Sequence, residues 1–121
     1  MPVKHWMPVC LFALMAAWPL AGLAHTHLDK AEPAEDAVLA EPPESVRLVF
    51  SGRIEPEFSR VEVIDAEGRE VHQGDPSVSQ NRREVEIGLE PGLGAGTYQV
   101  NWSVVARDGH RVRGEYTFSV E

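Results

Sequence analysis

The sequence predicts an all-β sandwich or barrel that follows a short apolar leader. Three observations carry this prediction. Apolar and polar residues alternate with a period of two through most of the chain, and helical periodicity is absent. Turn-forming clusters rich in Gly, Pro and Asp separate the alternating stretches at near-regular intervals. The chain that remains after the leader has the length of one small immunoglobulin-like sandwich.

The leader, residues 1–24, has the pattern of a secretory signal peptide. Lys4 precedes an apolar run that is too short to be a stable bilayer-spanning anchor. The small residues Gly22 and Ala24 follow, as a signal peptidase requires. We expect cleavage after Ala24, which gives a mature domain of residues 25–121 with no stable membrane anchor. The alternative is an uncleaved N-terminal anchor.

The composition of this mature domain limits its chemistry. Removing 24 residues from a chain of 121 leaves 97, and the only Cys and all three Met are lost with the leader. The domain therefore has no disulfide, thiol or thioether. It retains 10 Lys and Arg against 19 Asp and Glu, a net charge of −9. This acidity argues against nucleic acid or anionic lipid as a partner and suits a soluble protein that meets cations.

The expected strands are found by following the alternation along the chain. Residues 28–45 contain three prolines and predict an edge strand or an extended lead-in segment. Trp102, which lies on an alternating apolar face, is expected to anchor the core. The strands are expected around 46–50, 61–63, 85–89, 98–104 and 112–120, with turns at 65–68, 73–77 and 90–96.

Motifs for catalysis are absent from the sequence. The mature domain has no Cys nucleophile, no GxSxG, no phosphate-binding loop and no HExxH. The remaining candidates are histidines, including His110 in the segment ARDGHRVRG. Asp-Gly between alternating stretches predicts a hairpin turn without any function. Asp108 and His110 flank Gly109, however, and both are metal-ligand types placed at the end of a rigid sandwich.

Cleavage after Ala24 would make His25 the first residue. A free α-amine has an ordinary pKa of about 7.7–8 and loses its proton at modest cost when a metal competes for the nitrogen. The amine and the ring of His25 can close one chelate, to which His110 adds a nitrogen and Asp108 an oxygen. Such N,O sets are typical of Cu(II), whereas zinc would favour a tetrahedral arrangement. The alternative is that the processed terminus begins with His by chance.

His27 offers a competing local site. A free amine, two deprotonated amides and an imidazole at the third position can bind Cu(II), and the HTH terminus satisfies that pattern. Such a site would need no fold. We favour the site made by His25, Asp108 and His110, because a local site would leave the C-terminal motif unexplained.

Three segments carry a family resemblance: HTHLDKAEPAE, the pattern PxxVxLxFS from Pro43 to Ser51, and GTYQVNWSVVARDGHRVRGEYTFSV from Gly96 to Val120. Together they resemble the CopC family of periplasmic copper-binding proteins over nearly all of the mature domain. The resemblance implies a cupredoxin-like or immunoglobulin-like Greek-key β-sandwich. It also implies a Cu(II) site formed by the mature N-terminal histidine, matching His25, and by the loop residues Asp108 and His110.

Two departures from the family pattern bear on the metal. Many family members have Glu where this chain has Gly52, and in some of them that Glu touches the metal. Some members bind Cu(I) through a Met-rich segment, which a domain without Met cannot do. The sequence therefore predicts a member that binds only Cu(II).

The leading functional prediction is a periplasmic copper carrier or buffer in copper resistance, a monomeric binding protein and not an enzyme. The resemblance also implies a partner of the CopD type, an inner-membrane copper transport protein. One alternative is an oxidative copper enzyme, because polysaccharide monooxygenases also use an N-terminal-histidine copper site. The other is a structural immunoglobulin-like module in which DGH is only a turn.

Overall fold

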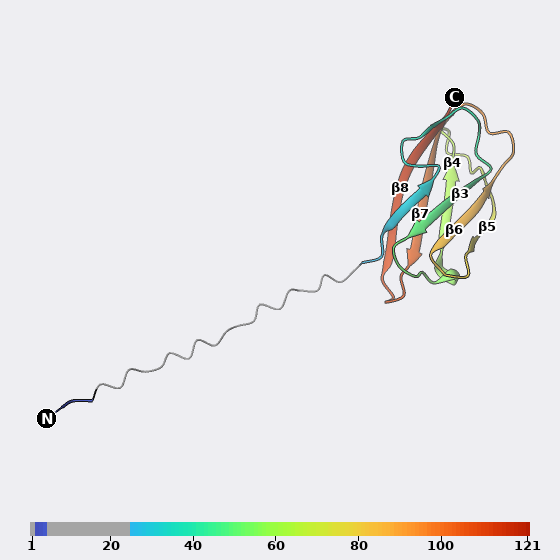
Figure 1. The fold of residues 1–121 in the computed structure, drawn as a ribbon. Helices are drawn as coiled ribbons and strands as arrows, with labels where there is room; N and C mark the ends of the chain where they lie inside the picture. Colours follow the sequence, from blue (N-terminus) through green and yellow to red (C-terminus); the bar gives the residue numbers. More distant parts are fainter. Residues whose placement is uncertain (1, 5–24) are drawn as a thin grey trace.

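The computed structural model describes residues 2–4 and 25–121, and its strands form two four-stranded sheets packed face to face (Figure 1). This arrangement confirms the predicted all-β Greek-key sandwich. Residues 5–24, with the predicted apolar run and cleavage site of the leader, lie outside the described residues. In the described ranges, no helix has the length and apolar character needed to cross a bilayer.

Each sheet combines strands that are distant in the sequence. The first sheet has the order β1 (Leu28–Glu32), β3 (Ser45–Phe50), β6 (Glu84–Leu89) and β5 (His72–Val78). The second has the order β2 (Val38–Leu39), β8 (Arg111–Val120), β7 (Gly96–Val105) and β4 (Arg60–Ile64). A single 3₁₀ turn, η1 (Pro56–Phe58), precedes β4.

The core fills the space between the sheets with the apolar residues of the alternating stretches. Trp102 of β7 is only 8% exposed and meets Phe50 of β3 edge to face, with ring centroids 5.2 Å apart. The predicted core role of Trp102 is thus confirmed. Trp102 also lies opposite Gly114 of β8, where a Cβ atom would come within 2.5 Å of its Cζ2. A residue without a side chain is therefore required beneath the indole.

One turn prediction was wrong. Residues 73–77 lie inside β5, and the pairing of β5 with β6 shifts register between Gln73 and Ser77. Gly74 has a φ of +70°, which favours glycine. Because β5 is at the edge of its sheet, a bulge containing Gly and Pro can interrupt the strand without ending it.

The segment 28–45 serves both sheets. Its first part forms β1 at the edge of the first sheet, which confirms the edge-strand prediction. Its second part forms the short β2, which pairs in parallel with β8 at the edge of the second sheet. The chain therefore crosses from one sheet to the other before β3 begins.

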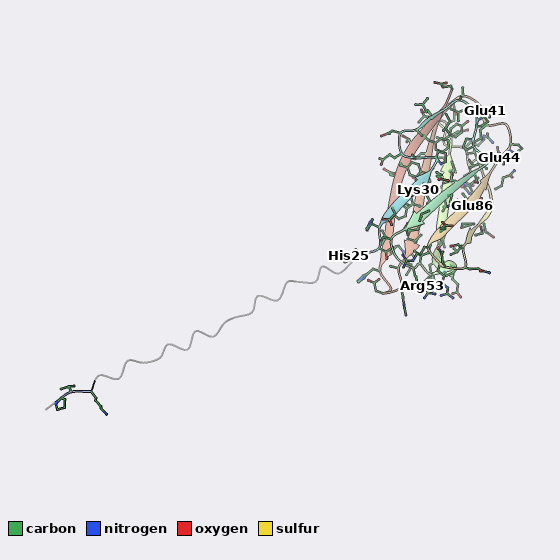
Figure 2. All side chains as sticks on the ribbon, viewed as in Figure 1. His25, Lys30, Glu41, Glu44, Arg53 and Glu86 are labelled. Atoms are coloured by element: carbon green, nitrogen blue, oxygen red, sulfur yellow. The ribbon has the colours of Figure 1, made fainter. Side chains whose placement is uncertain are left out.

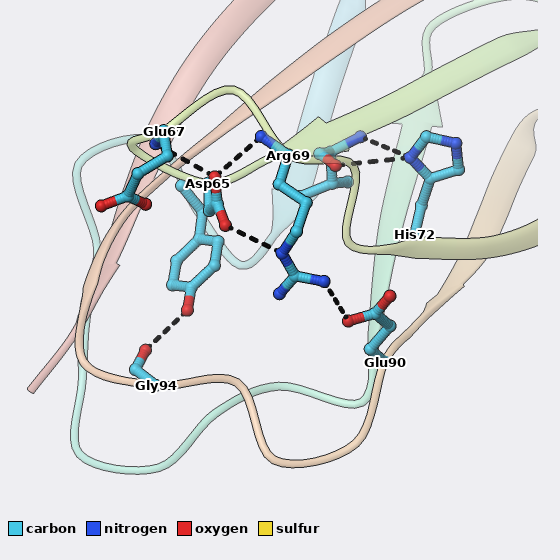
Figure 3. A network of polar contacts seen from close by, with 8 residues as sticks. Asp65, Glu67, Arg69, His72, Glu90 and Gly94 are labelled. Carbon is cyan, nitrogen blue, oxygen red and sulfur yellow. Dashed lines mark hydrogen bonds and ion pairs between the residues drawn. The ribbon is translucent and has the colours of Figure 1, made fainter.

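A polar network fastens the turn after β4 (Figure 3). Asp65 accepts hydrogen bonds from the backbone N–H groups of Glu67 and Arg69, and these bonds, that of Arg69 foremost, lower the pKa of Asp65. The guanidinium of Arg69 also contacts Asp65 and Glu90. His72 is half-buried, and its Nδ1 accepts a hydrogen bond from the N–H of Val63 at 3.1 Å.

Candidate metal site

The hairpin turn between β7 and β8 presents the predicted loop ligands. The N–H of Gly109 donates to the carbonyl of Ala106 at 2.9 Å, and the N–H of Ala106 donates to the carbonyl of His110 at 2.8 Å. Gly109 has a φ of +90°, the left-handed region that the tight turn requires. The predicted turn is confirmed, and it leaves Asp108 and His110 exposed at its tip.

Asp108 holds the ring of His110. One carboxylate oxygen of Asp108 accepts the backbone N–H of His110 at 3.0 Å, and the other lies 2.9 Å from Nδ1 of the His110 ring. In this arrangement Nδ1 is paired with the carboxylate, so a metal bound by both Asp108 and His110 would have to displace this contact. The hydrogen bond to the His110 ring lowers the pKa of Asp108, and the same bond raises the pKa of His110.

The segment before β1 is fastened to the same end of the sandwich. The N–H of His27 donates to Oγ of Ser51 at 2.9 Å, and the N–H of Ser51 donates to the carbonyl of His27 at 2.8 Å. Nearby, Thr26 packs against Gly52, where a Cβ would lie 2.6 Å from Oγ1 of Thr26. We call the reciprocal bonding of His27 and Ser51 the terminal clasp. Because the chain is fixed at His27, only Thr26 separates His25 from the terminal clasp. His25 is therefore held near the loop.

The structure places the His25 ring against the His110 ring. Their centroids are 6.4 Å apart and the planes are inclined by 72°. An imidazole nitrogen binds a metal at about 2.0–2.1 Å, so a ring centroid lies roughly 3 Å from the metal and two opposed rings roughly 6 Å from each other. The observed spacing therefore suits one metal between two imidazoles, which is compatible with a tetragonal N,O arrangement.

The side chains alone do not complete a metal cage. Across residues 2–4 and 25–121, no group of three or more His, Cys, Asp or Glu is close enough to hold a metal ion. Asp108 contacts His110, and His110 faces His25. In the 121-residue chain the backbone nitrogen of His25 belongs to the peptide bond with Ala24. The amine donor of the predicted set therefore exists only after cleavage.

His27 is bound to other groups. Its Nε2 lies 2.9 Å from a carboxylate oxygen of Asp29, and its Nδ1 lies 3.2 Å from the carbonyl oxygen of His25. A local HTH site would need the deprotonated amide of His27, whose N–H donates to Ser51. Forming that site would thus break the terminal clasp and disturb the start of β1.

Ser51 is a positioning residue that the sequence analysis did not identify. Its role depends on a contact between residues 24 positions apart, and a serine after a strand has no distinctive pattern of its own. The PxxVxLxFS motif ends at this residue, and that was the available signal.

Replacing Asp108 should change how His110 titrates. In metal-free protein, Asp108→Asn should lower the pKa of His110 toward its ordinary value of 6.5, because the carboxylate that stabilises the protonated ring is lost. An NMR titration of the ring protons measures this shift, with His72 as the internal control. An unchanged His110 titration would contradict the contact between these side chains.

Comparison with known proteins finds relatives of this chain among copper-related proteins. The profile of the CopC domain family matches residues 28–121. Protein YobA of Escherichia coli K12 is 33% identical over 99 residues, covering 81% of this chain and 80% of YobA. Copper resistance protein C of Escherichia coli is 32% identical, covering 84% of this chain and 85% of that protein. Copper transport protein CutJ of Bacillus subtilis is 26% identical, covering 97% of this chain but only 21% of CutJ.

Solved structures share the fold. The crystal structure of CopC from Methylosinus trichosporium OB3b superposes with a TM-score of 0.70 at 33% identity, covering 80% of this chain and 94% of that one. PcoC from Escherichia coli, described as a methionine-rich copper resistance protein, also gives 0.70 at 29% identity and covers 81% and 100%.

Proposed function

Because the chain belongs to the CopC domain family, we propose that residues 25–121 act as a periplasmic Cu(II) carrier or buffer in copper resistance after cleavage of residues 1–24. The proposed ligands are the amine and ring of His25, the ring of His110 and the carboxylate of Asp108. The single observation that best supports this site is the His25 ring facing the His110 ring at 6.4 Å.

The donor set favours Cu(II) over Cu(I). The ligands are nitrogen and oxygen atoms, which suit Cu(II), whereas Cu(I) is selected by thiolates and thioethers. The related PcoC is named as methionine-rich, but residues 25–121 contain neither Met nor Cys. The two proteins therefore differ in the ligands that would matter most for Cu(I).

The position of the site suits exchange of its cargo. Asp108 and His110 lie at the tip of the turn, and both side chains are more than half exposed. Copper would therefore enter and leave without opening the core. Because the amine and imidazoles must lose their protons to bind, acid should promote release.

A binding role is better supported than catalysis. A monooxygenase acting on a polysaccharide needs a broad face with exposed aromatic rings. Of the six aromatic residues after residue 24, only Phe58 is exposed, and the other five are in the core. No observation of this kind favours the enzymatic alternative.

The proposed partner is a membrane copper transporter of the CopD type. A domain alignable with nearly all of this chain makes up 21% of CutJ, a protein named for copper transport. The same kind of domain thus occurs within a longer copper transport protein. By analogy, this chain would serve a separate transporter by transient contact.

Loop and terminal variants test the site directly. In protein beginning at His25, His110→Ala should weaken Cu(II) binding by at least about 100-fold, because losing a ligand exceeds the 10- to 100-fold cost of losing a group that only supports one. Asp108→Ala should also weaken it. His27→Ala should leave it unchanged. Competition with a chelator of known affinity measures all three.

The opposite pattern would overturn this assignment. If His27→Ala abolished binding and the loop variants retained it, copper would lie on the local HTH site. If correctly processed wild-type protein bound no Cu(II) tightly, the proposed function itself would fail. A tight Cu(I) complex would contradict the preference for Cu(II).

A further inference from the structure

Four arginines surround the end of the sandwich that carries the metal site. Two come from the loops after β3 and β7, and two from the loop before β6. All four side chains are exposed. This basic rim consists of Arg53, Arg82, Arg83 and Arg107.

Backbone hydrogen bonds join the loops of the basic rim into one surface. The N–H of Arg107 donates to the carbonyl of Arg53 at 3.1 Å. The carbonyl of Arg82 accepts the N–H of Ile54, and that of Arg83 accepts the N–H of Phe50, both at 2.8 Å. The backbones of the four arginines are therefore held at one end, beside the hairpin that carries Asp108 and His110, and the guanidinium of Arg83 donates to the carbonyl of Ser51 at 3.1 Å.

The basic rim is little neutralised within the chain. In the described residues, no ion pair involves Arg53, Arg83 or Arg107, and the contact of Arg82 with Glu55 is long at 3.9 Å. Outside the rim, Arg60, Arg111 and Arg113 also have no ion pair among residues 25–121, whereas the other three arginine and lysine side chains of that range are paired. Lys30, Arg47 and Arg69 each have a carboxylate within 3.2 Å.

Acidic groups collect at the other end. Figure 2 shows His25 and Arg53 at one end of the sandwich and Glu41 and Glu44 at the other. The turns and loops at that far end carry many of the exposed carboxylates. They include Glu35, Asp36, Glu41, Glu44, Glu67 and Glu121, whereas Glu57 and Asp108 are exposed at the metal-site end.

We propose that the basic rim is a docking surface for an acidic face of the protein that exchanges copper with this site. The proposal rests on the proposed function. An acidic partner would otherwise be repelled by a domain of net charge −9. The uneven charge distribution favours approach of such a partner to the end that carries the metal site. An arginine guanidinium can also bind a carboxylate through two parallel hydrogen bonds.

A protein face suits this surface better than a lipid surface. The carboxylate-rich far end and the net charge oppose approach to an anionic bilayer. Phe58 is the only large apolar side chain exposed among residues 51–59, so the rim offers little to insert into a membrane. Arginines set around a metal loop instead suit a partner whose own metal-binding residues lie among carboxylates.

Acceptor peptides of different charge test the proposal. Each carries a Gly-Gly-His head, which binds Cu(II), followed by six Glu, six Ser or six Lys residues. Processed, copper-loaded protein should transfer Cu(II) to the Glu peptide at least about tenfold faster than to the Ser peptide at low ionic strength, and more slowly to the Lys peptide. Added salt should remove the difference.

Paired charge reversals locate the effect. Arg53→Glu combined with Arg83→Glu should abolish the advantage of the Glu peptide. The matched control, Lys30→Glu combined with Arg69→Glu, changes net charge equally outside the basic rim and should preserve that advantage. In metal-free protein, a hexaglutamate peptide should shift the NMR signals of rim residues and not those of the far end.

Several results would overturn the docking surface. These are transfer rates that ignore acceptor charge, a control variant as impaired as the rim variant, or hexaglutamate shifts outside the rim. Co-sedimentation with phosphatidylglycerol vesicles, lost in the rim variant, would identify a membrane surface instead. Because the hexaglutamate titration needs no copper, it tests the rim even if tight Cu(II) binding, and with it the proposed function, fails.

Discussion

A single extra residue before His25 should abolish high-affinity Cu(II) binding while the sandwich stays folded. The extension turns the α-amine into a peptide N–H, which is a poor ligand unless it is deprotonated. The new amine lies about 3.8 Å further along the chain, so the chelate with the His25 ring opens. Affinity should fall by at least about 100-fold, more than the cost of losing a group that only supports a ligand.

The comparison needs two proteins that differ only at the terminus. Mass spectrometry establishes that one begins at His25 and the other one residue earlier, and chelator competition gives their Cu(II) affinities. Circular dichroism provides the check that both fold, since the terminal clasp begins only at His27. Equal affinities for the two proteins would show that the amine is not a ligand.

Gly114→Ala should destabilise the domain by about 1–3 kcal/mol, the usual cost of forcing an extra methyl into a packed core. Its Cβ would lie 2.5 Å from Cζ2 and 2.7 Å from Cε2 of Trp102. The indole cannot readily move away, because Phe50 packs against it with ring centroids 5.2 Å apart. For a domain of this size, the loss lowers Tm by roughly 4–8 °C per kcal/mol.

Gly94→Ala is the matched control. Nothing lies within 4 Å of a Cβ built there, and the backbone of Gly94 is not in the left-handed region. That variant should keep or slightly raise Tm, since alanine restricts the unfolded chain. Thermal denaturation of both variants measures the difference. A Gly114→Ala protein as stable as wild type would mean that the indole has another place to go.

The core strands could be predicted because apolar residues occupy every second position, and these are the positions that are buried. Val46, Leu48 and Phe50 of β3 all point into the core, as expected from the sequence. The bulge in β5 could not be predicted, since Gly and Pro that interrupt an edge strand look like a turn in sequence. Whether 73–77 bends or continues depends on β6, to which it pairs across the sheet.

The candidate site was predictable where its residues form a local motif. Asp108 and His110 lie two residues apart around a turn glycine, and cleavage rules point to His25. Metal binding by these three residues remains a prediction. The basic rim could not be predicted, because its arginines come from three loops. Backbone contacts between residues distant in sequence, such as those of Arg53 with Arg107 and of Ile54 with Arg82, join these loops.

The terminal clasp has a consequence for how the metal site is assembled. Because the chain is fixed at His27, His25 stands on a two-residue tether, and its effective concentration at the loop is high. The same short tether allows little slack, so a terminus trimmed or extended by one residue would miss the site. Under the proposed cleavage, the peptidase's choice of bond determines metal affinity, and removal of the leader is the last step in making the ligand set.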